Sequence, residues 1–246
     1  MKLLFSLLTL TLLSSTSFAN LPVAKETIKS FDHNPWTMLL KKHVDSDGKV
    51  NYKNFKVDEA KLDRHLNKLS ATVIDEKVWN KEEQMAFWIN AYNAFTVKLI
   101  LKHYPVKSIM ELEKGKPWNL QFITIGGVKM SLNHIENNIL RTKFNDPRIH
   151  FAIVCASYSC PLLLNTAYTG ELLQGQLEEQ TKKFINDSKR NIITVKKAKL
   201  SEIFNWFKGD FTKNGSLVDF INRYAIVKIT AKTKISFLPY QWNLNE

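Results

Sequence analysis

Two cysteines carry the clearest chemical potential in this sequence, and both lie in one short segment. Cys155 and Cys160 are the two cysteines of the 246-residue chain, in the stretch Val-Cys-Ala-Ser-Tyr-Ser-Cys-Pro that begins at Val154. A cysteine becomes a nucleophile when its thiol pKa is lowered and a base lies within reach. Cys155 is therefore a candidate catalytic thiol, with the backbone N–H groups that follow it available to stabilise an oxyanion.

The nearest candidate base is His150, but the expected local geometry resists a direct pair. Residues 148–154 read as a buried strand that starts after Asp146-Pro147. Along a strand, positions 150 and 155 would face opposite sides and lie roughly 16 Å apart. A His150–Cys155 pair therefore requires a bulge or a sharp bend, or else the fold supplies His134 as the base.

A disulfide is the competing interpretation of the same two cysteines. Neighbouring cysteines in an exported protein often pair, because the compartment is oxidising. Closing so short a loop would stabilise the fold by about 2 kcal/mol, and the two Cα atoms must approach within about 7 Å. A free catalytic thiol, a Cys155–Cys160 disulfide and inert or redox-labile thiols all remain open on the sequence alone.

Polar side chains elsewhere could complete a site. Asn90 and Asn93 lie on one face of an otherwise apolar helix, where an amide without a partner would cost about 1–3 kcal/mol. These amides either brace neighbouring backbone or line a pocket, where Asn93 would orient a catalytic histidine. Glu136 is ambiguous in the same way, because Asn133 and Glu136 have the spacing of a helix-opening capping box. The catalytic candidates are Cys155, His150 and Asn93, and the binding candidates are Asn90, Glu136, Arg148 and Ser157.

Metal and cofactor chemistry finds little support. His134, Glu136, His150 and Cys155 contain suitable donor atoms, but no CxxC or HExxH spacing organises them. We expect no metal site and no cofactor.

The elements that must position these residues indicate an α+β fold. Lys81 to His103 is the strongest predicted helix, apolar nearly all round and ended by Pro105, which suits the centre of a domain. Gly126-Gly127 between two short β-prone runs predicts a hairpin over 122–130. Further helices are expected over 24–43, 58–69, 133–141, 170–186, 201–208 and 216–224, and further strands over 50–52, 192–200, 227–230 and 235–238. The pattern predicts a single domain over 20–246, with a buried central helix packed on a small mixed sheet.

The first residues predict export. Lys2, an apolar run from Leu3 to Leu13 and Ser17-Phe18-Ala19 have the order of a signal peptide over residues 1–19. The apolar run is too short to cross a bilayer, which needs about 20 residues. We expect an exported protein, periplasmic or secreted, that does not span a membrane.

The charge balance is basic, at +12 with Lys and Arg dispersed along the chain. No run reaches the length that marks a nucleic-acid-binding arm, so we expect no nucleic-acid partner. A solvated basic surface and attraction to anionic envelope material both fit this pattern. The sequence does not specify the oligomeric state.

Four motifs, in order, resemble domain-of-unknown-function family 547 (DUF547). They are Glu83-x-x-Ala-Phe-Trp-Ile-Asn-Ala-Tyr-Asn-Ala, Ser131-Leu-x-x-Ile-Glu-x-x-Ile-Leu-Arg141, Asp146-Pro-Arg-Ile-His-Phe-Ala-Ile-Val-Cys-Ala-Ser and Ser159-Cys-Pro-Leu. The resemblance runs from about Trp36 to the closing Tyr240-x-Trp-Asn-Leu-Asn. The family's usual Glu-His pair reads Glu136-Asn137 here, which weakens an enzymatic interpretation if that histidine takes part in chemistry. The resemblance implies an architecture and one shared pocket, but no agreed reaction.

Two functions follow as hypotheses. The first is a thiol-dependent hydrolase or acyl transferase of the cell envelope that uses Cys155, with His150 or another histidine supplied by the fold moving the proton. The second is a non-catalytic envelope module with a Cys155–Cys160 disulfide that binds a peptide, a glycan or an envelope protein. A mainly structural domain without a pocket is a third possibility.

Overall fold

The computed structural model describes residues 30–246. The predicted signal peptide at 1–19 and the start of the predicted helix over 24–43 lie outside the described residues. Within residues 30–246, none of the helices combines the length and apolar character needed to cross a membrane.

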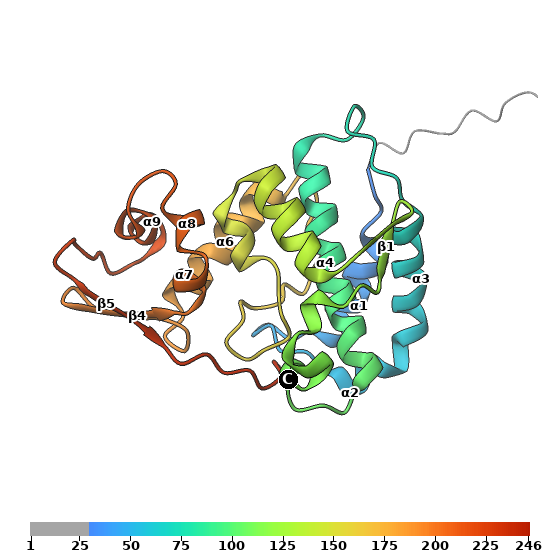
Figure 1. The fold of residues 1–246 in the computed structure, drawn as a ribbon, viewed down its shortest axis with the longest axis horizontal. Helices are drawn as coiled ribbons and strands as arrows, with labels where there is room; N and C mark the ends of the chain where they lie inside the picture. The colour runs from blue at the N-terminus through green and yellow to red at the C-terminus, as the bar shows by residue number, and fades with distance from the viewer. Residues whose placement is uncertain (1–29) are drawn as a thin grey trace, which may run out of the picture.

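The centre of the fold is helix α4 (Lys81–His103), as predicted. It begins with a capping box in which the Asn80 side chain accepts from the Glu83 N–H and the Glu83 carboxylate accepts from the Asn80 N–H. Its apolar circumference is buried because helices surround it (Figure 1). These neighbours are α2 (Tyr52–Phe55), α3 (Glu59–Ala71), α5 (Leu132–His134), the π-helix η4 (Ile135–Phe144) and α6 (Leu173–Asn186).

The remaining elements of this first core are short. The predicted hairpin is present as β1 (Ile123–Ile125) and β2 (Val128–Met130), paired antiparallel, with Gly126 and Gly127 both at positive φ in the turn. The other elements are α1 (Asn34–His43) and the 3₁₀ turns η1 (Lys56–Asp58), η2 (Ile109–Gly115), η3 (Pro117–Asn119) and η5 (Pro147–Phe151).

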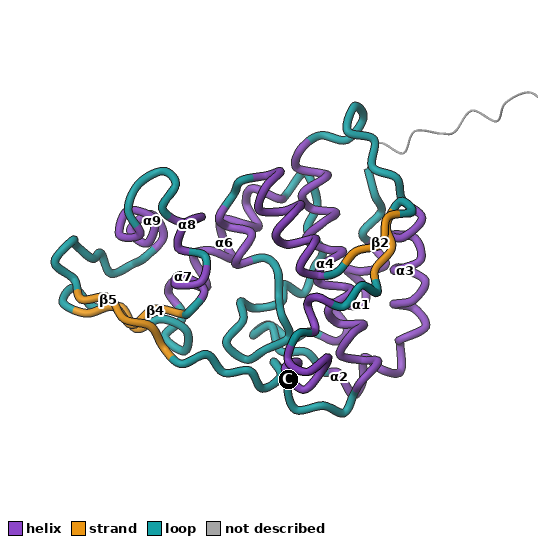
Figure 2. Tube along the Cα trace, viewed as in Figure 1, coloured by secondary structure: helices purple, strands orange, loops and turns teal. Residues whose placement is uncertain are grey.

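A second hydrophobic cluster forms around Phe151 and the C-terminal elements. The mixed sheet has the order β3 (Ile192–Ile193), β4 (Lys197–Ser201) and β5 (Lys234–Leu238), with an antiparallel first pair and a parallel second pair. Three short helices, α7 (Ile203–Trp206), α8 (Lys208–Phe211) and α9 (Leu217–Tyr224), belong to the same cluster. Figures 1 and 2 show β4, β5 and α7–α9 on one side of the molecule, α1–α4 on the other and α6 between them. The chain is an α+β fold with a buried central helix and small sheets.

The predicted strand over 148–154 is wrong, although the segment is buried as expected. Asp146 accepts from the Arg148 N–H, and Pro147 stands in the first turn of the 3₁₀ helix η5. The backbone that follows bonds to a side chain instead of a strand, because the Asn93 amide pairs with the Ala152 carbonyl and the Val154 N–H. A continuous apolar run does not distinguish a buried strand from a buried helical turn.

Four smaller expectations also need correction. Of the segment 50–52, Val50 forms only an isolated bridge to Val44, and Tyr52 already starts α2. Residues 227–230 are not a strand, since the Asn222 amide satisfies the backbone of Ile229. The cap before Glu136 is Ser131, which accepts from the His134 N–H, and the helix predicted over 201–208 begins at Ile203, the first residue of α7.

Candidate ligand pocket

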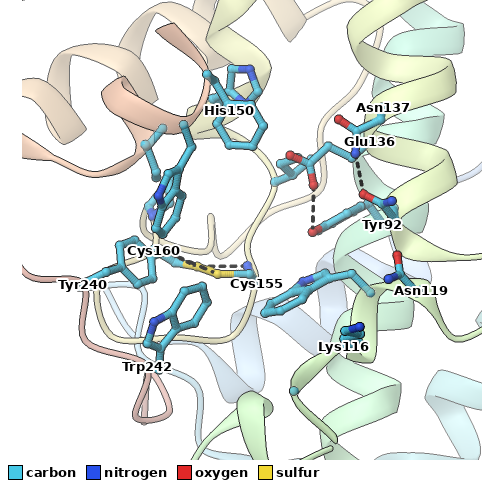
Figure 3. Close-up of a pocket in the computed structure, with 18 residues that line it drawn as sticks. Tyr92, Lys116, Asn119, Glu136, Asn137, His150, Cys155, Cys160, Tyr240 and Trp242 are labelled. Atoms are coloured by element: carbon cyan, nitrogen blue, oxygen red, sulfur yellow. Dashed lines mark hydrogen bonds between the residues drawn. A yellow bond between two sulfur atoms is a disulfide. The ribbon is translucent and has the colours of Figure 1, made fainter. Parts of the chain in front are cut away.

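A cavity lies where the two hydrophobic clusters meet. It has a volume of about 520 Å³. Tyr92 of α4 and Glu136 and Asn137 of η4 line one side, and Ile203, Trp206 and Phe207 line another. His150, the two cysteines, Trp118, Tyr240 and Trp242 also border it (Figure 3).

The Cys155–Cys160 pair forms a disulfide at this pocket. The two sulfurs are bonded and the Cα atoms lie 6.2 Å apart, within the range that a disulfide needs. Cys155 is half-buried, whereas only 2% of Cys160 is exposed. In this state Cys155 has no thiol, so the catalytic role predicted for it would require prior reduction.

The loop that carries the disulfide is held on both sides. The Tyr158 and Ser159 N–H groups donate to the Asn243 and Gln241 carbonyls, which belong to the C-terminal segment after β5. On the other side Arg190 donates through Nε to the Cys160 carbonyl at 2.6 Å. Ala156 has a φ of 60°, a left-handed conformation that costs a non-glycine residue about 1–3 kcal/mol and persists only where surroundings enforce it.

His150 reaches the pocket, but its polar partner is a residue that the sequence did not point to. Its Nε2 lies 2.8 Å from Asp210 Oδ2, and its ring stacks on Phe207 at 4.0 Å between centroids. Burial lowers the pKa of His150, while the Asp210 carboxylate opposes that shift. Conversely, the hydrogen bond from His150 holds the pKa of Asp210 well below its usual range. Neutral His150 therefore donates Nε2–H to Asp210.

The structure brings His150 and Cys155 to one pocket without pairing them. Among the hydrogen bonds of residues 30–246, none joins the two side chains, and Figure 3 shows His150 apart from the disulfide. His134, the alternative base, is exposed and does not line the cavity.

Glu136 presents a titratable carboxyl group to the pocket. Burial raises its pKa to about 7, against the opposing effects of the Arg141 charge and of the Tyr92 hydroxyl, which lies 3.4 Å away. Arg141 itself is paired with Asp210, which links Glu136 electrostatically to the His150 pair. Glu136 stands in the first turn of the π-helix η4, a rare backbone form that frequently occurs at functional sites.

The other predicted polar residues have different positions. Asn90 pairs with both backbone groups of Tyr168, whereas Asn93 donates to the Ala152 carbonyl and accepts from the Val154 N–H. Neither is among the pocket-lining residues of the described chain, and Arg148 is paired with Asp146 outside it. Ser157 is fully buried and contacts both sulfurs at 3.2 Å.

The aromatic wall of the pocket was not predicted. Trp206 lies 4.8 Å from Tyr240 and 5.8 Å from Trp242, and Trp118 lies 5.7 Å from Trp242, measured between ring centroids. These rings come from η3, α7 and the C-terminal segment, so no spacing in the sequence relates them. The one available signal was the presence of Tyr240 and Trp242 in the closing motif. Within the described residues, no group of three His, Cys, Asp or Glu side chains is placed to hold a metal ion.

Comparison with known proteins gives one match. The family model described as "Protein of unknown function, DUF547" matches residues 77–185. Neither the curated proteins nor the solved structures gave a significant match. The matched segment includes Tyr92, Glu136, His150 and both cysteines, but ends before Trp206, Tyr240 and Trp242. Residues 77–185, which supply Glu136 and His150 to the pocket, are thus similar to the DUF547 family.

Proposed function

We propose that this protein is an exported envelope protein that binds a short glycan in the pocket without transforming it. The observation that carries the proposal is the composition of the pocket: aromatic rings gather on one side, and a carboxyl group and amides stand on another. A sugar ring has an apolar C–H face suited to an aromatic side chain and hydroxyl groups that both donate and accept.

The polar side of the pocket suits hydroxyl groups in particular. Asn119, Asn133 and Asn137 each carry an amide that donates and accepts, and Glu136 adds a carboxyl group. Lys116 provides one cation at the border, which favours a glycan with an acidic group. The export part of the proposal rests on the signal-like residues 1–19. Cell fractionation with N-terminal sequencing tests it, and we expect a mature end at Asn20.

The glycan proposal is tested on Trp206, because that side chain is 47% exposed and its loss leaves little buried surface unfilled. Trp206→Ala should weaken binding of an N-acetylglucosamine tetramer roughly 5- to 150-fold, since it removes one stacking face worth about 1–3 kcal/mol. Trp206→Phe keeps a ring and is the matched control, and calorimetry measures both. The glycan proposal would be wrong if the protein bound neither this nor other envelope oligosaccharides. Binding of short peptides in the same assay would then identify a peptide as the ligand.

A second candidate function is thiol-dependent hydrolysis or acyl transfer by Cys155 in the reduced protein. The observation that favours it is the strained Ala156 directly after Cys155, since such backbone clusters at active sites. Cys160→Ser frees the Cys155 thiol without a reductant. The variant should then give an acyl adduct on Cys155 with p-nitrophenyl acetate, detected by mass spectrometry. An adduct rate equal to that of a free cysteine peptide would exclude this function.

A further inference from the structure

The two cysteines of the disulfide differ in exposure. Both cysteines border the pocket, but Cys155 is half-buried whereas only 2% of Cys160 is exposed. In thiol–disulfide exchange the attacking thiolate approaches one sulfur and the other sulfur leaves. The accessibility of the pair therefore makes Cys155 the attacked atom and Cys160 the leaving atom.

Hydrogen-bond donors gather around the sulfur that would leave. The Cys155 N–H lies 3.0 Å from Cys160 Sγ, the Ser157 hydroxyl 3.2 Å and the Tyr240 hydroxyl 3.3 Å. Each hydroxyl has a single proton, and both also lie within 3.4 Å of Cys155 Sγ. A disulfide sulfur is a weak acceptor and gains little from nearby hydrogen-bond donors. A thiolate, by contrast, is stabilised by each donor that points at it.

The donors are fixed in place. Ser157 is wholly buried, and the backbone after it is bound to the C-terminal segment that also carries Tyr240. The Arg190 guanidinium, which is paired with Asp187, donates to the Cys160 and Tyr158 carbonyls and holds the loop beside this cluster. A developing negative charge on Cys160 would thus meet oriented dipoles without rearrangement.

We propose that the Cys155–Cys160 disulfide exchanges with a thiol-bearing ligand that enters the pocket. The thiolate of the ligand attacks Cys155 Sγ, the sulfur–sulfur bond breaks, and its electron pair goes to Cys160 Sγ, which leaves as a thiolate. A second thiolate then attacks the ligand sulfur of the mixed disulfide, releasing an oxidised dimer of the ligand and the Cys155 thiolate. Two ligand thiols are oxidised and the protein disulfide is reduced. The inference goes beyond glycan binding and does not depend on it.

The experiment measures reduction of the native protein by glutathione, followed by acid quenching and intact-mass analysis. We expect a transient adduct of one glutathione, and peptide mapping should locate it on Cys155. Ser157→Ala and Tyr240→Phe each remove one donor, and each should slow reduction roughly tenfold, the worth of one hydrogen bond to a charged group.

The same loop offers a matched control. Tyr158 is bound through its backbone, and its hydroxyl contacts neither sulfur. Tyr158→Phe should react at the wild-type rate. Circular dichroism verifies folding, and if Ser157→Ala fails to fold, the pair Tyr240→Phe and Tyr158→Phe decides alone.

Three results would overturn the inference. The first is a native disulfide that glutathione reduces only in urea. The second is an adduct on Cys160. The third is a folded Tyr240→Phe variant that is reduced as fast as Tyr158→Phe. Glycan binding is measured separately by calorimetry, so failure of one proposal leaves the other standing.

Discussion

At the scale of single residues, the pocket contains one carboxyl group whose ionisation is held back by its surroundings. Glu136 has an ordinary pKa of 4.5 in the unfolded chain and a pKa of about 7 in the fold. A raised folded pKa means that the fold binds the proton more tightly than the unfolded chain does. Stability is therefore full below pH 4.5 and falls as the pH rises through 7.

Glu136→Gln should remove this pH-dependent loss of stability, because the amide resembles the protonated carboxyl group and does not ionise. Above pH 7 the variant should be more stable than the wild type by about 2–3 kcal/mol, and near pH 4 the two should match. Urea unfolding at pH 4, 6 and 8 measures the difference. The exposed Glu171→Gln is the control, and an equal gain there would show a general charge effect.

The residue types near the cysteines allowed candidate site residues to be predicted from the sequence. The residues that these candidates contact in the fold could not be predicted. The disulfide was one of the interpretations that the sequence left open, and Ser157 was a candidate for contact with a ligand. The partner of His150 is Asp210, which lies 60 positions away on α8. No local pattern marks such a residue, because the fold alone brings it to the imidazole.

At the scale of elements, single side chains join neighbouring segments. Asp210 of α8 binds Arg141 of η4 and His150 of η5, so one carboxylate holds three elements at the pocket. Asn93 of α4 holds the segment that leads from η5 to the disulfide loop.

Asp210→Asn should destabilise the protein by about 2–4 kcal/mol at pH 7, because it leaves a half-buried guanidinium without its counter-charge. The low folded pKa of Asp210 means that its stabilisation is present above the unfolded pKa and is lost as the pH falls toward the folded one. The deficit of the variant should therefore shrink in acid. Thermal unfolding at pH 7 and pH 3 follows it, with the exposed Asp47→Asn as control.

Asn93→Ala should lower the free energy of unfolding by about 2–4 kcal/mol, because it leaves a buried carbonyl and a buried N–H unpaired. Urea unfolding measures the loss, and the exposed Asn54→Ala should cost far less. Equal losses in the two variants would contradict the bracing role.

The elements themselves were largely predictable where periodicity and caps agreed. The helix at Lys81–His103, the Gly-Gly hairpin and the helix predicted over 216–224 all follow from local sequence. The segment 148–154 did not, because its apolar run fits a buried strand and a buried 3₁₀ turn equally well. Its bonds to Asn93 decide between the two, and they come from a distant helix.

At the scale of the whole molecule, the pocket exists because two hydrophobic clusters meet and the C-terminal segment crosses between them. This segment leaves β5, supplies Tyr240 and Trp242 and binds the disulfide loop. It then reaches the first cluster, where the Tyr52 hydroxyl donates to Asn245 at 2.8 Å.

Deletion of residues 239–246 should expose the disulfide loop and remove part of the aromatic wall. We expect faster proteolysis within residues 155–160 and loss of glycan binding, while the antiparallel β1–β2 hairpin and α4 remain folded. Limited proteolysis and hydrogen exchange test this. If the loop of the truncated protein stayed fully protected from proteolysis and hydrogen exchange, the C-terminal segment would not be what holds the loop in place.

The distance along the chain between the disulfide loop and the segment that fastens it has a consequence for biogenesis. The two cysteines are 5 positions apart, whereas Gln241 and Ser159 are 82 apart. Loop closure over so short a span takes nanoseconds, while contacts of long sequence separation form late in folding. In the unfolded chain the two sulfurs thus meet each other without the hydroxyl of Tyr240 beside them, and the donors reach the pair only once the C-terminal segment has docked.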